Sequence, residues 1–302
     1  MKPWSARSAR SRAAILMLGQ ALGFALMGAG IRIASDRGIH VFEIAFFRNF
    51  FGLLFALPLL YGSGLALLKT DRFHIYFLRC VIGLTAMFCG FWALAHLPLG
   101  KAVALGYSAP LFVTIGAVLL LKEDVRWRRW SAVVVGFLGV LVIVRPGWVE
   151  LDRDVLIALA GAVFSAGAVI SIKFLSRTES TEAIVLWMVL IMTPLSLIPA
   201  LTVWTWPDAI GWALLAGIGL IGTVSHLAVT RAYQLGDASV LQVYGYAQLP
   251  FAVLFGWWLF DERLDLWVGL GSAIIVGAGL FIAHREAVRR APTVTDPRAG
   301  GG

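Results

Sequence analysis

The chain has 302 residues, of which 60% are hydrophobic and only 14% are charged. Soluble domains are typically about half apolar and about a quarter charged, so this composition excludes an ordinary soluble domain and indicates a membrane protein. The net charge of +8 does not indicate a nucleic-acid partner, because the positive residues gather in alternate loops.

Ten apolar stretches follow one another along the chain, separated by short segments that carry charges, glycine or proline. A helix needs roughly 20 apolar residues to cross a hydrocarbon core about 30 Å thick, and the stretches are close to that length. We therefore predict an all-α integral membrane protein with ten transmembrane helices. They cover approximately residues 13–34, 41–61, 73–95, 101–121, 130–145, 154–176, 182–203, 209–232, 237–260 and 265–284.

The distribution of Lys and Arg predicts how these spans are oriented. Seventeen of the 25 lie in the termini and in every second loop, six lie in the other loops, and Arg48 and Arg79 lie within spans. Cytoplasmic segments carry the excess of positive charge, so we predict a multi-pass protein of a bacterial-type inner (plasma) membrane with both termini cytoplasmic. Residues 1–12 form the basic N-terminus, and residues 286–302 are predicted to be a disordered tail.

An internal repeat divides the chain into two halves. The sequence Ser-Ala-Val-Val-Val-Gly at 131–136 recurs as Ser-Ala-Ile-Ile-Val-Gly at 272–277, a shift of 141 residues. We therefore predict two five-helix repeats, residues 13–147 and 154–285. Four further pairs of residues are shifted by 139 to 141 positions: Arg32 and Lys173, Glu43 and Glu182, Pro110 and Pro250, and Glu123 and Glu262.

An odd number of helices in each repeat has a geometric consequence. The first helix leaves the cytoplasmic side, whereas its counterpart, the sixth, enters from the opposite side, so the two repeats must be inverted. Inverted repeats are typical of carriers that open a central site alternately to the two sides of a membrane. The repeat therefore predicts a transporter whose substrate site lies between the halves.

The fourth and fifth spans carry a series of motif residues: Leu-Pro-Leu-Gly-Lys-Ala at 97–102, Pro110, Glu123, Arg129 with Trp130, Gly-Phe-Leu-Gly-Val at 136–140 and Arg-Pro-Gly at 145–147. This pattern resembles the drug/metabolite transporter superfamily, EamA type. The resemblance covers about residues 13–285. In the second half the proline and the glutamate are kept, while Gln248 and the neighbours of Glu262 depart from the pattern.

This resemblance implies a central cavity formed by the first, third, fourth, sixth, eighth and ninth helices. Members of the family include exporters of amino acids, and others resemble carriers of vitamins or adenosylated metabolites. We therefore expect an exporter of amino acids or related small polar metabolites that works by alternating access. The alternative is an importer of a vitamin or nucleoside-like metabolite of the riboflavin or S-adenosylmethionine type.

Two prolines occupy matching positions in the fourth and ninth spans. Pro110 and Pro250 each remove a backbone hydrogen bond from a helix and permit it to bend. Bends at equivalent positions of two inverted halves suit two gates, and static bends are the alternative interpretation.

Polar side chains near these prolines are the strongest candidates for substrate binding. Tyr244 and Gln248 are four residues apart and share one helix face, whereas Gln242 and Tyr246 share a nearly opposite face. Shifting Gln248 by 140 residues gives Ser108, so symmetry favours one of the two faces. The predicted lining set is Tyr107, Ser108, Tyr244 and Gln248, and Gln242 and Tyr246 are then assigned to packing.

Other helices contribute weaker candidates that share a face at i, i+4 spacing or correspond by symmetry. Aromatic pairs at this spacing are more often part of the core than of a site, and a histidine at depth is as often structural as functional. These candidates are Gln20 and Phe24 in the first span, Phe88 and Trp92 in the third, Ser165 in the sixth and His226 in the eighth.

A charge within a span is costly unless it meets a partner or a cavity. Arg48 is interpreted either as an anchor for an anionic substrate group or as a structural residue that pairs with Glu43 or reaches the interface. Arg79 lies near the inner end of the third span, where we expect its side chain to reach the membrane interface.

Missing residue types narrow the function further. No Asp or Glu falls in the central third of any span, which favours uniport or exchange over proton coupling. An intramembrane enzyme needs several converging catalytic groups, and only His226 is available, so we expect no enzymatic activity, metal or cofactor. A membrane scaffold that transports nothing is the third class of function that we consider, beside a transporter and an intramembrane enzyme. Expected partners are a small-molecule substrate and the lipid bilayer, without nucleic acid, for a monomer or homodimer.

Overall fold

The computed structural model of the chain describes residues 3–63, 70–121, 127–145, 152–175, 179, 181–235, 244–263 and 265–290. The helices are α1 (Pro3–Asp36), α2 (Val41–Ser63), α3 (Phe73–His96), α4 (Leu99–Gly106), α5 (Ala109–Leu121), α6 (Trp127–Val144), α7 (Arg153–Leu175), α8 (Thr181–Thr202), α9 (Ala209–Leu235), α11 (Gln248–Phe260) and α12 (Leu266–Arg290). The described residues contain no strand, so the predicted all-α fold is confirmed.

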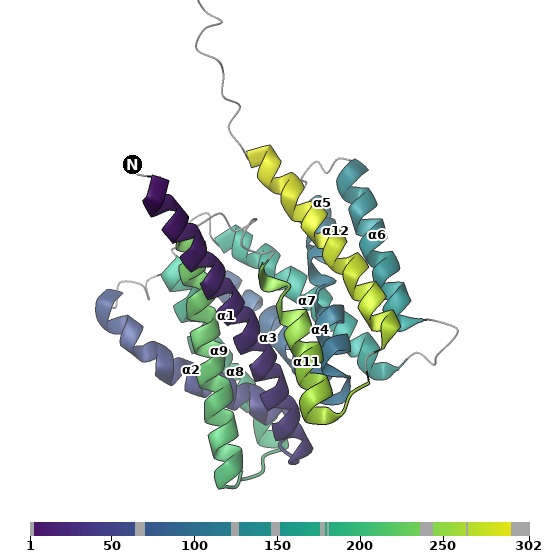
Figure 1. Cartoon of the computed structure of the whole chain (residues 1–302). Helices are drawn as coiled ribbons and strands as arrows, with labels where there is room; N and C mark the ends of the chain where they lie inside the picture. Colours follow the sequence, from purple (N-terminus) through teal and green to yellow (C-terminus); the bar gives the residue numbers. More distant parts are fainter. Residues whose placement is uncertain are drawn as a thin grey trace, which may run out of the picture.

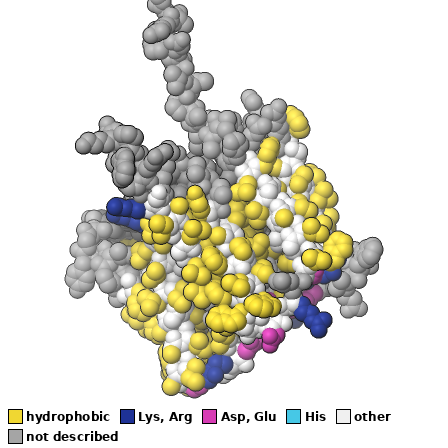
Figure 2. Space-filling model, in the orientation of Figure 1, with side chains coloured by type: hydrophobic (Ala, Val, Ile, Leu, Met, Phe, Trp, Pro, Cys, Tyr) yellow, Lys and Arg dark blue, Asp and Glu magenta, His cyan; other side chains and the backbone are white. Residues whose placement is uncertain are grey.

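Most helices coincide with predicted spans, because apolar length sets both. Five described segments are long and apolar enough to cross a bilayer: Ser11–Asp36, Phe73–His96, Leu99–Gly116, Arg153–Ile172 and Ala209–Val229. The full count of ten spans stays a prediction. Figure 2 shows hydrophobic side chains over the middle of one face, with basic and acidic side chains at its lower edge. Such an apolar belt suits contact with lipid.

Helices of the two halves pack in matching pairs (Figure 1). The repeat relates each helix of the first half to one of the second: α1 to α7, α2 to α8, α3 to α9, α4 with α5 to α11, and α6 to α12. α1 packs on α9 as α7 packs on α3, and α11 packs on α1 as α5 packs on α7. α2 packs on α8, and α6 on α12. Exchanging each helix with its counterpart leaves these pairs unchanged, as a pseudo-two-fold axis requires.

Contacts at one end of the bundle fix the directions of the helices. The ends of α1 and α3 meet there, because Arg32 Nη1 donates a hydrogen bond to the Leu97 carbonyl at 2.7 Å. The end of α3 meets the start of α7, because Trp92 Nε1 donates to Asp154 Oδ1 at 2.7 Å. α1 therefore ends where its counterpart α7 begins, so the two repeats run in opposite directions.

We name the two ends of the bundle after two glutamates. The end just described is the Glu262 end, since Glu262 lies there between α11 and α12. The other is the Glu179 end, where Glu179 accepts hydrogen bonds from the hydroxyls of Thr70 and Tyr76 near the start of α3. In Figure 1 the start of α1 and the end of α12 both lie on the side away from the Glu262 end.

The last helix is longer than predicted. Residues 286–290 were expected in the disordered tail, but α12 continues to Arg290, which corrects the boundary. The reason is that these residues favour helix, and the first breaker after them is Pro292. The rest of the predicted tail, residues 291–302, lies outside the described residues. At the other terminus, α1 begins at Pro3, within the basic segment 1–12.

Close approach of α6 and α12 depends on glycine. A Cβ atom at Gly139 would lie 2.8 Å from the carbonyl oxygen of Gly271, which is closer than real Cβ contacts. Small residues allow membrane helices to bring their backbones together and to gain packing that lipid cannot supply.

Candidate functional site

The fourth and ninth spans are interrupted at equivalent positions. In the first half, α4 ends at Gly106, Tyr107 and Ser108 form a turn, and α5 begins at Ala109. In the second half, a turn at residues 246–247 precedes α11. The two turns are 139 residues apart in sequence, which matches the repeat. Interrupted helices at equivalent positions of inverted halves are a sign of a transport site.

The two prolines stand at the beginnings of helices rather than within continuous ones. Pro110 is the second residue of α5, and Pro250 is the third residue of α11. Backbone N–H groups in the first turn of a helix have no intrahelical acceptor, so a proline there removes no helical hydrogen bond. Each predicted kink is therefore observed as a break, and a gating role for the prolines stays a prediction.

The two breaks contact each other across the halves. The Tyr107 hydroxyl donates to the carbonyl of Gly245 at 2.7 Å, and it lies 3.3 Å from Oε1 of Gln248. Its ring is 4.9 Å from that of Tyr246, centroid to centroid. Irregular backbone at membrane depth needs such partners, because lipid offers no hydrogen bonds. Tyr107 and Gln248 of the predicted set are thus brought together.

The other members of that set lie differently. Ser108 is fully buried, and its hydroxyl donates to the Leu105 carbonyl at 2.6 Å, so it closes its own turn. Tyr244 is 37% exposed. The Tyr246 hydroxyl lies against Gly279 of α12, and the same side chain lines the pocket described below. Gln242 lies outside the described residues.

The candidates on α1 and α9 form a second group. The rings of Phe24 and His226 meet edge to face with centroids 5.1 Å apart. Gln20, one turn before Phe24, is buried. Ser165 is half-buried on α7, away from this pair in sequence and in helix pairing. The structure therefore brings Phe24 and His226 together between the halves.

The two aromatic candidates on α3 have different surroundings. Phe88 packs on Phe42 of α2 with ring centroids 4.8 Å apart, within an apolar cluster. Trp92 lies at the Glu262 end, where its indole binds Asp154, its ring stacks on His96 at 4.1 Å, and Arg153 lies 5.6 Å above it. Trp92 thus belongs to a polar network that joins the halves.

Arg48 is not paired with Glu43. The Glu43 carboxylate accepts the Thr205 backbone N–H at 2.7 Å and the His40 N–H at 3.2 Å. Arg48 Nη1 instead donates to Asn49 Oδ1 at 3.0 Å, and the structural interpretation through Glu43 is wrong. The role of Arg48 as an anion anchor stays a prediction.

Arg79, the second arginine within a span, lies on α3 and is only 7% exposed, so its predicted path to the membrane interface is wrong. Its Nη1 atom lies 4.0 Å from the Cys80 sulfur.

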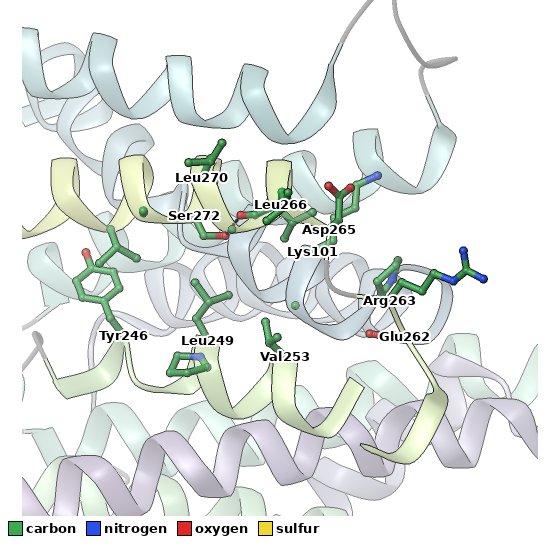
Figure 3. Close-up of a pocket in the computed structure, with 17 residues that line it drawn as sticks. Lys101, Tyr246, Leu249, Val253, Glu262, Arg263, Asp265, Leu266, Leu270 and Ser272 are labelled. Carbon is green, nitrogen blue, oxygen red and sulfur yellow. Dashed lines mark hydrogen bonds between the residues drawn. The ribbon is translucent and has the colours of Figure 1, made fainter. Parts of the chain in front are cut away.

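A pocket of about 740 Å³ opens between α4, α11 and α12 (Figure 3). Its walls are apolar, with Leu249 and Val253 facing Leu266 and Leu270. Charged side chains gather at the Glu262 end of this pocket. Of the residues predicted from sequence for the site, only Pro250 lines it, so this pocket is separate from the predicted lining set.

Sequence reasoning missed the role of Glu262. Both of its carboxylate oxygens accept the backbone N–H of Leu99, at 2.9 and 3.1 Å. Leu99 is the first residue of α4, so Glu262 caps a helix of the other half. Arg32 Nη1 lies 3.8 Å from the same carboxylate. The repeat relates Glu262 to Glu123 and so marks it as a residue of interest, but it does not indicate which residue Glu262 contacts. Among the described residues, no cluster of His, Cys, Asp and Glu is suited to a metal.

Comparison with known proteins divides the chain into the same two repeats. The EamA-like transporter family matches residues 11–145 and again residues 153–283. A riboflavin transporter of Vibrio cholerae is 32% identical over 277 residues, which cover 90% of this chain and 93% of that protein. An S-adenosylmethionine uptake transporter of Rickettsia prowazekii is 30% identical over 249 residues, with coverage of 82% and 84%.

The chain is also similar to an exporter and to a protein of known structure. A pseudopaline exporter of Pseudomonas aeruginosa is 30% identical over 270 residues, which cover 87% of this chain and 93% of that protein. A solved crystal structure of a protein that is 18% identical covers 94% of this chain and all of that one, with a TM-score of 0.60. At this identity the second similarity concerns the fold alone.

Proposed function

Because the chain belongs to the EamA-like transporter family, we propose that it carries a vitamin or nucleoside-like metabolite of the riboflavin or S-adenosylmethionine class across a bacterial membrane. The sequence alone favoured export of amino acids, whereas the names of the relatives support the alternative better. One relative is named an uptake transporter and another an exporter, so the assay below measures both directions.

The meeting of the two broken spans carries the proposal for the site. Tyr107 of one half bonds the backbone of the other half at Gly245, at 2.7 Å. Any rocking of one half against the other changes this contact, as alternating access requires. We place the substrate beside Tyr107, Tyr244 and Gln248, with Phe24 and His226 on the adjacent face. The Glu179 end, with both termini, is assigned to the cytoplasm.

Transport by the purified protein in liposomes tests this function. The liposomes are loaded with, or exposed to, riboflavin, S-adenosylmethionine and a pool of amino acids, and movement is read by mass spectrometry. We expect riboflavin or S-adenosylmethionine to move by uniport or exchange without a proton gradient. Movement of amino acids alone would return the assignment to amino-acid export.

Three substitutions test the site. Tyr107→Ala, Tyr244→Ala and Gln248→Ala each remove a polar group from the proposed lining and are expected to lower the transport rate about tenfold or more. Trp267→Ala is the matched control, because this aromatic residue is 51% exposed and is the second residue of α12, at the Glu262 end. Wild-type rates in all three variants would reject the site.

A further inference from the structure

The pocket between α4, α11 and α12 runs from the Glu262 end toward the middle of the bundle. Figure 3 shows Tyr246, which belongs to the break before α11, at one end of the pocket and the charged side chains at the other. Along α12 the lining extends from Leu266 to Val276, a separation of ten residues or about 15 Å of helix. The hydrocarbon core of a bilayer is about 30 Å thick, so the pocket is about as deep as one leaflet.

The α12 wall of this pocket is not covered by protein. Leu266 and Leu270 are 80% and 56% exposed, although both are large apolar side chains. In a membrane protein such a surface meets hydrocarbon rather than water. Trp267 at the start of α12, and Trp257 and Trp258 near the end of α11, are exposed as well. Exposed tryptophans are typical of the level at which a membrane meets water, so the charged end of the pocket lies near the lipid headgroups.

The two carboxylates at this charged end are already engaged. Glu262 accepts the Leu99 backbone N–H at 2.9 Å. Asp265 accepts a hydrogen bond from Arg145 Nη2 at 2.7 Å and another from the Trp267 backbone N–H at 2.8 Å. Both carboxylates therefore have donors within the protein and do not need a cation from the pocket.

Two cations at the same end lack such partners. Lys101 is the third residue of α4, Arg263 lies between α11 and α12, and both line the pocket. Within the part of the chain that the structure describes, the side chain of neither residue forms a hydrogen bond or an ion pair. Lys101 belongs to the first half and Arg263 to the second. The headgroup level of an apolar pocket thus presents unpaired positive charge from both halves.

We propose that this pocket binds an anionic phospholipid, with an acyl chain between α11 and α12 and the headgroup phosphate at Lys101 and Arg263. A chain that leaves the bilayer for the pocket exchanges one apolar surrounding for another, so the walls alone give little selectivity. Basic pockets between membrane helices select anionic headgroups, and each Lys or Arg near the surface favours them about fivefold. Two such residues are enough to distinguish an anionic lipid from a neutral one.

The charge also distinguishes a lipid from the other possible occupants. A second copy of this chain could cover the apolar walls, but its apolar face would leave Lys101 and Arg263 unpaired. The transported molecule must pass between the halves, whereas this pocket opens at the side of α12. The inference therefore concerns a lipid that stays bound during transport, and it does not depend on which substrate is carried.

Lipid selectivity of the full-length protein tests the headgroup site. The protein in detergent micelles is titrated with phosphatidylglycerol or with phosphatidylcholine of identical chains, and native mass spectrometry gives the Kd of the first bound lipid. We expect phosphatidylglycerol to bind about tenfold more tightly. Lys101→Gln and Arg263→Gln should each reduce this preference, and the double variant should abolish it. Arg37→Gln is the control, because Arg37 pairs with Asp208 at the same end and does not line the pocket.

A substitution on α12 tests the chain-binding part. Gly269 lines the pocket, and a Cβ atom there would have no other atom within 4 Å. Gly269→Leu therefore fills the pocket without a clash and should raise the Kd for phosphatidylglycerol about tenfold. The melting temperature without lipid should stay unchanged or rise, because leucine favours helix more than glycine does. Gly277→Leu is the matched control, since it has equal space on the same helix but does not line the pocket.

Three results would overturn the proposal, and none of them touches the carrier function. Equal Kd values for the two lipids in the wild-type protein would remove the anionic headgroup site. A preference that survives in the double variant, or tight binding that survives in Gly269→Leu, would place the lipid elsewhere. Dimerisation that Gly269→Leu abolishes, without any change in lipid binding, would assign the pocket to a second copy of the chain.

Discussion

Among the residues that the structure describes, the two ends of the bundle differ in how the halves are joined. At the Glu262 end, five polar contacts link the first half to the second. They are Arg37 with Asp208, Glu43 with Thr205, Trp92 with Asp154, Leu99 with Glu262, and Arg145 with Asp265. At the Glu179 end, the described residues contribute the bonds from Thr70 and Tyr76 to Glu179.

At the Glu262 end, several separate polar links thus hold the two halves together. The inverted repeat places equivalent helices at both ends, and the described contacts at the Glu262 end come from helix ends and loops of both halves. The ion pair of Arg145 with Asp265 is partly exposed, and such a pair contributes about 1 kcal/mol or less. Separate polar links of this kind can break and re-form, as alternating access requires.

Covalent locking of the Glu262 end should have the largest effect. Arg37→Cys and Asp208→Cys, in a background with Cys80 and Cys89 replaced by Ala, place two thiols across the halves. A bifunctional thiosulfonate reagent should reduce transport to background, because the halves can no longer separate, and dithiothreitol should restore it. The measurement is uptake into liposomes. Each single-cysteine variant is the control, and full transport in the locked protein would exclude rocking at this end.

Loss of the Glu262 carboxylate should have the next largest effect. Glu262→Ala leaves the Leu99 N–H and Arg32 without their shared acceptor, which costs about 1.5–3 kcal/mol for a charged hydrogen bond. The melting temperature in detergent should fall by several degrees. Gly256→Ala should act in the same direction without a change of charge, because its new Cβ would overlap the Glu262 carboxylate.

The neighbouring Asp261 provides the control for this prediction. Its side chain is exposed, and its backbone is left-handed, with φ of 50° at the end of α11, a conformation that Asn tolerates well. Asp261→Asn removes a carboxylate next to Glu262 and should leave the melting temperature unchanged. Equal losses in both variants would mean that the loop, rather than the cap on α4, stabilises this end.

Much of the fold could be predicted because it follows from local composition. The lengths of the apolar stretches predicted the helices, and the internal repeat predicted two halves that run in opposite directions. The break at Tyr107 and Ser108 was not foreseen, since a proline after a polar turn has the same sequence pattern whether the helix bends or restarts. The boundary at Arg290 was missed for the opposite reason, because a composition rich in Pro and Gly was extended into residues that favour helix.

The site was less predictable because its contacts join distant residues. Tyr107 and Gln248 could be matched, since the repeat shift relates their positions. No sequence rule connects Glu262 to Leu99, which are 163 residues apart, or shows that Glu43 prefers Thr205 to Arg48. The burial of Arg79 was missed because position along a span gives depth in the membrane and not direction around the helix axis.

The smallest effect expected at the Glu262 end is a response to pH. Burial raises the pKa of Glu262 above its usual 4.5, against the opposing influence of the Leu99 N–H and Arg32. The Asp208 pKa is lowered below 3.8 by the Gly211 N–H and by Arg37. Glu262 therefore takes up a proton at a higher pH than an exposed glutamate does, while Asp208 stays ionised and keeps its link to Arg37.

The sign of the response follows from proton linkage. In an open state Glu262 is hydrated and has its ordinary pKa, so the closed state binds the proton more tightly. Closure is thus fully favoured below about pH 4.5 and loses this contribution as pH rises through the raised pKa. Spin labels on Asp36→Cys and Ala209→Cys, which lie across the halves, should show a shift toward short distances as the pH is lowered from 7.5 to about 4.5. Glu262→Gln should remove the shift, and a shift toward long distances would reverse the assignment of the buried carboxylate to the closed state.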